Sequence, residues 1–200
     1  MVNFNRLAFI YDSLKWLVFQ GTIDKATRFY LGTIPENARV LILGGGTGAL
    51  LQQLKPSHLI DYVELSTQMI KKAKNRPFQA KVNFYQEDLL RFSTEASYDY
   101  VITPFILDCF SEEQLYSILQ KYQAFIKPRG YWIQTDFYAQ NKGQNFLVKC
   151  MYFFFRLTAG LKQAQLPDFN KAFQKNAFIE KNNVRFKHGL IQSRLYQKIE

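Results

Sequence analysis

The sequence predicts an α/β fold in which helices cover both faces of a doubly wound, mainly parallel sheet of seven strands. Apolar runs such as Arg39–Leu43 alternate with helical segments five times, and unbroken runs of this kind are typical of strands buried in a parallel sheet. A loop rich in glycine, residues 44–48, follows the first run. The tail, residues 184–199, alternates like an antiparallel hairpin added to the fifth strand.

The length of 200 residues fits a single domain, with residues 1–37 as an N-terminal helical cap and residues 38–200 as the α/β core. The first residues do not resemble a secretory signal, and the apolar stretch Phe146–Leu161 is short for a bilayer span and carries Lys149 and Arg156. Cys109 and Cys150 lack the spacing of a metal or redox site. We therefore expect a cytoplasmic protein without a metal centre.

Local signals place the elements in order. Ser66 is expected to cap one helix, and Ser-Glu-Glu-Gln from Ser111 reads as a capping box for another. Pro128-Arg129-Gly130 is expected to mark the end of that second helix. The expected helices are Leu7–Phe19, Ile23–Leu31, Gly48–Leu54, Ser66–Arg76, the helix from Ser111, Phe146–Leu161 and Asp168–Lys181. The expected strands are Arg39–Leu43, Leu59–Leu65, Val82–Gln86, Tyr98–Thr103, Tyr131–Phe137, Val184–Ile191 and Ser193–Ile199.

The glycine loop and Glu64 together predict a nucleotide-type site. Gly44, Gly46 and Gly48 allow a tight turn and expose backbone N–H groups at the start of the next helical segment. Glu64 ends the second strand at the same edge of the sheet, where a carboxylate can accept both hydroxyls of a ribose. The spacing of Gly44, Gly46, Ala49 and Glu64 also fits a dinucleotide fingerprint, so the loop alone leaves the cofactor open.

Five segments in register resemble the core motifs of class I S-adenosylmethionine-dependent methyltransferases, with similarity from about Ala8 to the C-terminus. The segments are residues 44–48, Val63-Glu64-Leu65-Ser66 with Met69, Ile70 and Ala73, residues 82–88, residues 98–103 and residues 128–132. Ile10-Tyr11-Asp12-Ser13-Leu14, with Val18-Phe19, also resembles the leading helices of quinone-biosynthesis and related small-molecule methyltransferases. One position departs from the family pattern, because Ile42 stands where the family usually has an acid that helps hold the methionine moiety.

The resemblance implies S-adenosylmethionine as cofactor and a role for each matching residue. The loop backbone would approach the methionine portion, and Glu64 would hold the ribose. Asp88, or Glu87 if the register slips, would accept from the adenine amino group. Leu65, Met69 and Leu89 would enclose the adenine, the backbone of Thr103 would meet the ammonium, and Tyr11 would lie over the methionine end. The implied binding residues are Tyr11, Gly44, Gly45, Gly46, Gly48, Glu64, Leu65, Met69, Glu87, Asp88, Leu89 and Thr103.

No catalytic residue is assigned, because methyl transfer from a sulfonium needs alignment and exclusion of water more than a general base. Candidates near the strand ends are Asp108, Asp136, Tyr138 and Tyr11. We expect a small, apolar or ring-containing acceptor. Nucleic acid is not expected, because Thr103-Pro104-Phe105-Ile106 replaces the motif of amino-directed nucleic-acid methylation.

Two other functions stay open. A nicotinamide-dependent oxidoreductase would need a sixth parallel strand in place of the hairpin, and it leaves the pair Glu87-Asp88 unexplained. A non-catalytic cofactor-binding protein that acts through a basic C-terminal surface stays open because of Ile42.

The charge is unevenly distributed along the chain. Residues 1–140 hold 15 Lys and Arg against 13 Asp and Glu, whereas residues 141–200 hold 11 against 3. This basic third is either a solvated outer face or a surface that attracts an anionic small substrate, an anionic membrane or RNA, and the lack of a nucleic-acid motif favours the first two partners over RNA. The aromatic run Tyr152–Phe155 fits core packing, the lining of an acceptor site, or contact with a membrane or a second subunit. The sequence does not indicate the oligomeric state.

Overall fold

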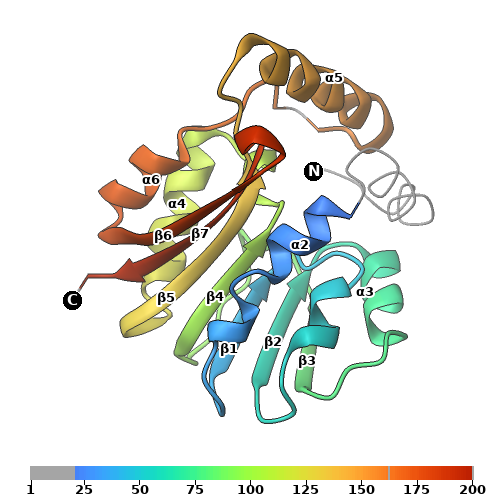
Figure 1. Cartoon of the computed structure of the whole chain (residues 1–200). Helices are drawn as coiled ribbons and strands as arrows, with labels where there is room; N and C mark the ends of the chain where they lie inside the picture. The colour runs from blue at the N-terminus through green and yellow to red at the C-terminus, as the bar shows by residue number, and fades with distance from the viewer. Residues whose placement is uncertain (1–20, 162, 200) are drawn as a thin grey trace.

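The computed structural model describes residues 21–161 and 163–199. A seven-stranded sheet with the order β3-β2-β1-β4-β5-β7-β6 runs through the molecule, with helices on both faces (Figure 1). Strands β1 to β5 pair in parallel, and β7 is antiparallel to both β5 and β6. The predicted fold class, including the C-terminal antiparallel hairpin, is therefore confirmed. The predicted helix Leu7–Phe19 lies outside the described residues.

The elements follow the predicted order. The strands are β1 (Arg39–Leu43), β2 (Leu59–Glu64), β3 (Lys81–Gln86), β4 (Tyr98–Pro104), β5 (Ile126–Phe137), β6 (Phe178–Phe186) and β7 (Ile191–Lys198). The α-helices are α2 (Thr22–Arg28), α3 (Thr67–Lys74), α4 (Glu112–Gln123), α5 (Lys142–Ala159) and α6 (Phe169–Lys175). Short 3-10 helices cover Leu31–Thr33, Ala49–Gln53, Leu107–Cys109 and Lys187–Gly189.

Both predicted helix caps are present. The Ser66 side chain accepts a hydrogen bond from the backbone N–H of Met69, in the first turn of α3. Ser111 and Gln114 form a complete capping box at the start of α4, in which each side chain accepts from the backbone of the other residue. Such caps satisfy N–H groups that have no partner within the helix, so they fix where each helix begins.

Several predicted bounds differ from the structure, among them the predicted strand Val184–Ile191, and three of the differences have a clear physical reason. The segment after the glycine loop is a 3-10 helix rather than an α-helix, because Pro56 disfavours helical backbone just before it and only a short segment remains. Pro128-Arg129-Gly130 lies inside β5, where the pairing register with β4 shifts and a proline can be tolerated. Helix α6 ends at Lys175, and β6 begins at Phe178, where the Phe178 ring packs edge-on against Trp132 in the core.

The buried side chains form one cluster on each face of the sheet and a third cluster above its carboxyl edge. One face carries Leu41, Trp132 and their neighbours under α4 and α6, and the other carries Val40 and Ile42. The third cluster joins Ile23 of α2 to residues of α5 and of the β5–β7 pair. It fixes two helices beside the edge where parallel sheets bind ligands. Among the residues that the structure describes, no helix is both long enough and apolar enough to cross a bilayer.

Candidate cofactor-binding site

The glycines of the loop are required by close packing as well as by the left-handed backbone of the turn. Gly44, Gly46 and Gly48 all have left-handed backbone, with φ of 67°, 62° and 75°. A Cβ on Gly45 would lie 2.3 Å from the ring of Tyr62, whose hydroxyl donates to the Gly46 carbonyl at 2.8 Å. A Cβ on Gly46, in contrast, would meet nothing within 4 Å. The loop is therefore supported from β2, and it has open space beside Gly46.

Glu64 fixes the loop from its other side. Its carboxylate accepts from the backbone N–H of Gly46 at 3.0 Å and from that of Ser66 at 2.8 Å. Burial raises the pKa of Glu64, and the backbone N–H groups around it oppose that rise. A carboxylate offers about four acceptor positions, so these two bonds leave capacity for a ligand.

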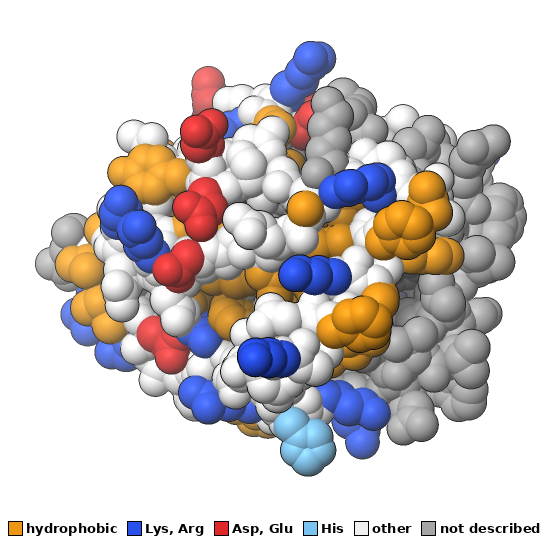
Figure 2. Space-filling view, turned by 90° about the horizontal axis from the view of Figure 1, so that it is seen from above, with side chains coloured by type: hydrophobic (Ala, Val, Ile, Leu, Met, Phe, Trp, Pro, Cys, Tyr) orange, Lys and Arg blue, Asp and Glu red, His pale blue; other side chains and the backbone are white. Residues whose placement is uncertain are grey.

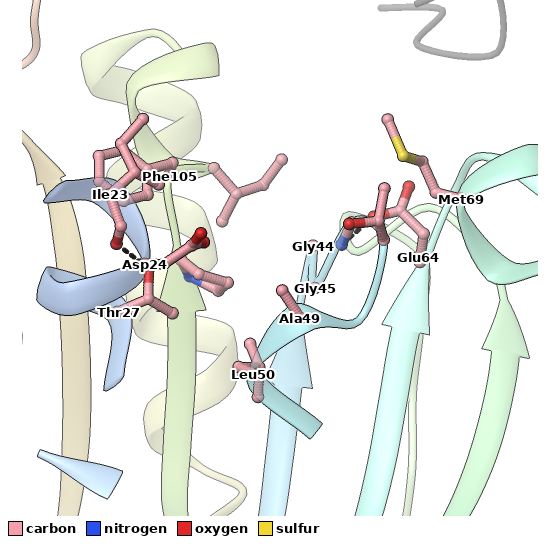
Figure 3. A pocket seen from close by; sticks show the side chains of 14 residues that line it. Ile23, Asp24, Thr27, Gly44, Gly45, Ala49, Leu50, Glu64, Met69 and Phe105 are labelled. Carbon is pink, nitrogen blue, oxygen red and sulfur yellow. Dashed lines mark hydrogen bonds between the residues drawn. The ribbon is translucent and has the colours of Figure 1, made fainter. Parts of the chain in front are cut away.

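The loop pocket lies between the glycine loop and α2. It is lined by Ile23, Asp24, Thr27, residues 44–47, Ala49, Leu50, Glu64, Met69 and residues 104–106. Figure 3 shows Asp24 and Glu64 on opposite sides of the loop, with apolar side chains such as Ile23 and Phe105 beside Asp24. Asp24 was not predicted from the sequence. The signal that was available is an acid that follows Ile23 within a helix already expected to cap the cofactor.

A second pocket, here called the acid pocket, lies on the other side of Glu64. It is lined by Gly44, residues 63–65, residues 87–90, Ile106, Cys109, Phe110, Gln114, Gly160 and Gln163. Gly44, Glu64 and Ile106 line both pockets, so the two are adjacent. Asp88 also accepts from the backbone N–H of Leu90 at 2.9 Å, which stabilises the turn after β3.

The structure brings most of the predicted binding residues together around these two pockets. The loop pocket contains Gly44, Gly45, Gly46, Glu64 and Met69, and the acid pocket contains Leu65, Glu87, Asp88 and Leu89 besides Gly44 and Glu64. Tyr11 lies outside the described residues.

Two predicted binding residues line neither pocket. Gly48 packs against Ala73, which a Cβ would approach to 2.7 Å. Thr103 is fully buried, and its hydroxyl accepts from the indole N–H of Trp132 at 2.9 Å. The chain first reaches the loop pocket at the next residue, Pro104, where β4 ends.

Ile42 belongs to the core. Its side chain is fully buried, and β1 places it in register with Tyr62 on one side and Ile102 on the other. It does not line the loop pocket. A carboxylate at position 42 would be buried among apolar side chains. The acidic side chain that the resemblance leads one to expect here would therefore have to come from another element of the fold.

Asp108 and Asp136 form a buried carboxyl pair below α5. Asp136 Oδ2 accepts from the backbone N–H of Asp108 at 3.3 Å, and the Tyr152 hydroxyl donates to the Asp108 carbonyl. Burial raises the pKa of Asp108 to about 6, and burial together with the charge of Asp108 raises the pKa of Asp136. Neither residue lines the loop pocket or the acid pocket.

The raised pKa values make stability depend on pH. The folded protein binds these protons more tightly than the unfolded chain, so this contribution is complete below about pH 4 and is lost as pH rises through about 6. Tyr138, another catalytic candidate, donates to Gln134 and lies under the Arg194 guanidinium, away from both pockets.

Residues 40–130 match the family model described as "Methyltransferase domain". The chain therefore carries a methyltransferase domain of the class I S-adenosylmethionine-dependent type over these residues. The match covers β1 to the start of β5, which includes the glycine loop, Glu64 and Asp88. Together with the antiparallel hairpin, this match decides against a nicotinamide-dependent oxidoreductase. The likeness of Ile10–Leu14 to quinone-biosynthesis methyltransferases is not confirmed.

Solved structures of methyltransferases share the fold at low sequence identity. Magnesium protoporphyrin IX methyltransferase from Synechocystis PCC 6803, solved with bound S-adenosylhomocysteine, aligns with a TM-score of 0.71 at 17% identity over 98% of this chain and 96% of its own. The N-methyltransferase NodS from Bradyrhizobium japonicum WM9 gives 0.66 at 14% over 90% and 87%. An O-methyltransferase family protein from Burkholderia thailandensis gives 0.75 at 13% over 96% and 60%. No curated protein sequence matches this chain.

Proposed function

We propose that the protein transfers the methyl group of S-adenosylmethionine to a small, apolar or ring-containing acceptor, with the adenosine held across Glu64. The observation that carries this proposal is the position of the Glu64 carboxylate, which lies at the junction of the two pockets and uses two of its acceptor positions on the protein backbone. The remaining positions suit the two hydroxyls of a ribose.

The residues on each side of Glu64 fit the two ends of the cofactor. In the acid pocket, Leu65 and Leu89 offer apolar surface for a base, and Asp88 offers an acceptor for its amino group. In the loop pocket, the open space beside Gly46 suits the methionine portion. When bound, the cofactor supplies an electrophilic methyl group on a cationic sulfur.

Asp24 is proposed to replace the acid that Ile42 does not provide. It comes from α2 rather than from β1, and it lines the same pocket as Gly44, Gly45 and Gly46. A carboxylate there would attract the ammonium of the methionine portion, because a charged hydrogen bond contributes about 1.5–3 kcal/mol.

Two ligands test the role of Asp24. S-adenosylhomocysteine carries the ammonium, whereas 5′-methylthioadenosine lacks the whole amino-acid group. Asp24→Asn should weaken calorimetric binding of the first by about tenfold or more and leave binding of the second unchanged. The exposed Glu36 serves as a matched control as Glu36→Gln. Equal losses for both ligands, or no loss for either, would contradict the assignment.

The lining of the loop pocket supports an apolar acceptor. Ile23, Phe105 and Ile106 stand beside the glycine loop, and none of them offers a charge or hydrogen-bonding side chain. The buried carboxyls Asp108 and Asp136 lie outside this pocket, so alignment and exclusion of water are the expected contributions to the rate. An acceptor that is already nucleophilic needs no strong base.

Ligand-dependent melting and label transfer test the function as a whole. S-adenosylmethionine and S-adenosylhomocysteine should raise the melting temperature, and NAD and NADP should not, because only ligands that bind the native state stabilise it. Radiolabelled methyl should then pass to members of a panel of small phenols and nitrogen heterocycles. Transfer only to oligonucleotides or to protein would overturn the proposed acceptor class, and stabilisation by NAD alone would overturn the proposed cofactor site.

A further inference from the structure

Helix α5 lies over the carboxyl end of the sheet (Figure 1), and within the described part of the chain one of its faces packs on the core. Val148 and Tyr152 are buried in the cluster that contains Phe137 and Ile191. The opposite face exposes Phe146 by 70%, Phe153 by 63% and Leu157 by 70%. These three residues are spaced by seven and by four, so they form one apolar stripe along the helix.

The charges on α5 are all positive. Lys142, Lys149 and Arg156 recur every seven residues and are exposed, so they form a basic row beside the apolar stripe. The sequence contains no acid between Asp136 and Asp168. Figure 2, which looks onto this end of the molecule, shows hydrophobic and basic side chains close together on one side of the view, while most acidic side chains in the view gather on the other side.

The apolar stripe and the basic row of α5 favour a lipid surface over a second copy of the chain as the binding partner. Single exposed apolar residues are ordinary, but a continuous stripe usually marks an interaction site. A second copy docked through the same stripe would bring one basic row close to another, with no acid on the helix to compensate. An anionic headgroup layer matches both features, because it accepts apolar side chains at the acyl boundary and attracts Lys and Arg.

We propose that α5 docks in the plane of an anionic membrane surface, with Phe146, Phe153 and Leu157 directed into it. Gly160, at the end of α5, lines the acid pocket together with Leu65. Docking would therefore hold the acid pocket near the lipid. The proposal goes beyond methyl transfer and does not depend on it, since docking needs neither cofactor nor acceptor.

Vesicle sedimentation of the full chain tests the proposal. The protein should bind phosphatidylcholine vesicles that contain phosphatidylglycerol more tightly than pure phosphatidylcholine vesicles, and added salt should weaken that binding. Phe153→Ser combined with Leu157→Ser should lower the partition coefficient by at least about tenfold. Lys149→Glu combined with Arg156→Glu should remove the preference for anionic vesicles.

Matched controls lie on β6, away from α5. Ile179 is 52% exposed and Lys181 is exposed, so Ile179→Ser and Lys181→Glu change the same surface chemistry elsewhere. Both should bind vesicles as the wild type does, and all variants should keep its melting temperature. Equal binding by the α5 variants, equal losses in the controls, or no wild-type binding to anionic vesicles would overturn the proposal. If the wild type does not bind anionic vesicles but forms a dimer, and if Phe153→Ser combined with Leu157→Ser dissociates that dimer, the apolar stripe is a contact with a second copy of the chain.

Discussion

Replacement of Glu64 tests the centre of the proposed site. Glu64→Ala removes a buried carboxylate that accepts from Gly46 at 3.0 Å and from Ser66 at 2.8 Å. Glu64→Gln keeps the size of the side chain but places an amide N–H₂ opposite one of these two donors. Alanine therefore removes the carboxylate that would contact the ligand. Glutamine instead places its amide N–H₂ against a backbone N–H, so that two hydrogen-bond donors face each other.

The magnitude follows from the bonds that a ribose would lose. Two hydrogen bonds to a charged acceptor contribute about 1.5–3 kcal/mol each. Since about 1.4 kcal/mol is one decade of affinity, the loss of one of them already weakens binding by about tenfold. We expect Glu64→Ala to weaken the binding of S-adenosylhomocysteine by at least about tenfold and Glu64→Gln to do so by a similar factor.

Titration calorimetry with two ligands separates binding from damage to the fold. An S-adenosylhomocysteine analogue that lacks the ribose 2′-hydroxyl should bind the wild type more weakly than the parent ligand does, and it should bind Glu64→Ala about as well as the parent ligand does. Glu95 is exposed in the loop after β3, so Glu95→Ala provides a control with the same chemical change. Parent affinity within about threefold of wild type in Glu64→Ala would refute the reasoning.

Three further predictions concern packing, capping and pH. Gly45→Ala should lower the free energy of unfolding by about 1–3 kcal/mol, because the new Cβ meets the ring of Tyr62. Gly32→Ala is the control, because a Cβ there has open space and should not lower stability. Equal melting temperatures of the two variants would contradict the prediction. Ser66→Ala should lose about 0.5–2 kcal/mol in denaturant titrations, and an unchanged midpoint would argue against the cap. Asp108→Asn removes one charge of a pair with raised pKa values, so its melting temperature should fall less than that of wild type between about pH 5 and about pH 8; parallel falls would contradict the pair.

The central strands β1, β2 and β4 were predictable because burial on both faces imposes a composition that local sequence shows directly. β1 matches its predicted bounds, and the two serine caps lie where the sequence placed them. The start of β6 was not predictable in the same way. Its position depends on the contact of Phe178 with Trp132, two residues that are far apart in the sequence.

The candidate site was predictable only as far as the sheet edge positions it. Glu64 and Asp88 end neighbouring parallel strands or follow them closely, so their common pocket follows from topology. The approach of Asp24 to the loop depends instead on how α2 packs, and no local pattern encodes that. Thr103 lines neither pocket for a related reason, because β4 continues to Pro104, where the chain first reaches the loop pocket.

The position of Asp24 on a helix, rather than on a strand, changes what the methionine end of the site depends on. An acid in β1 would be held by the sheet itself, whereas Asp24 is held by α2, whose neighbouring residue Ile23 is buried in the same cluster as Val148 and Tyr152 of α5. The helix proposed to meet the membrane and the helix proposed to hold the ammonium thus both pack into one apolar cluster. Because protein interiors are closely packed, we expect a displacement of α5 to reach α2 through this cluster.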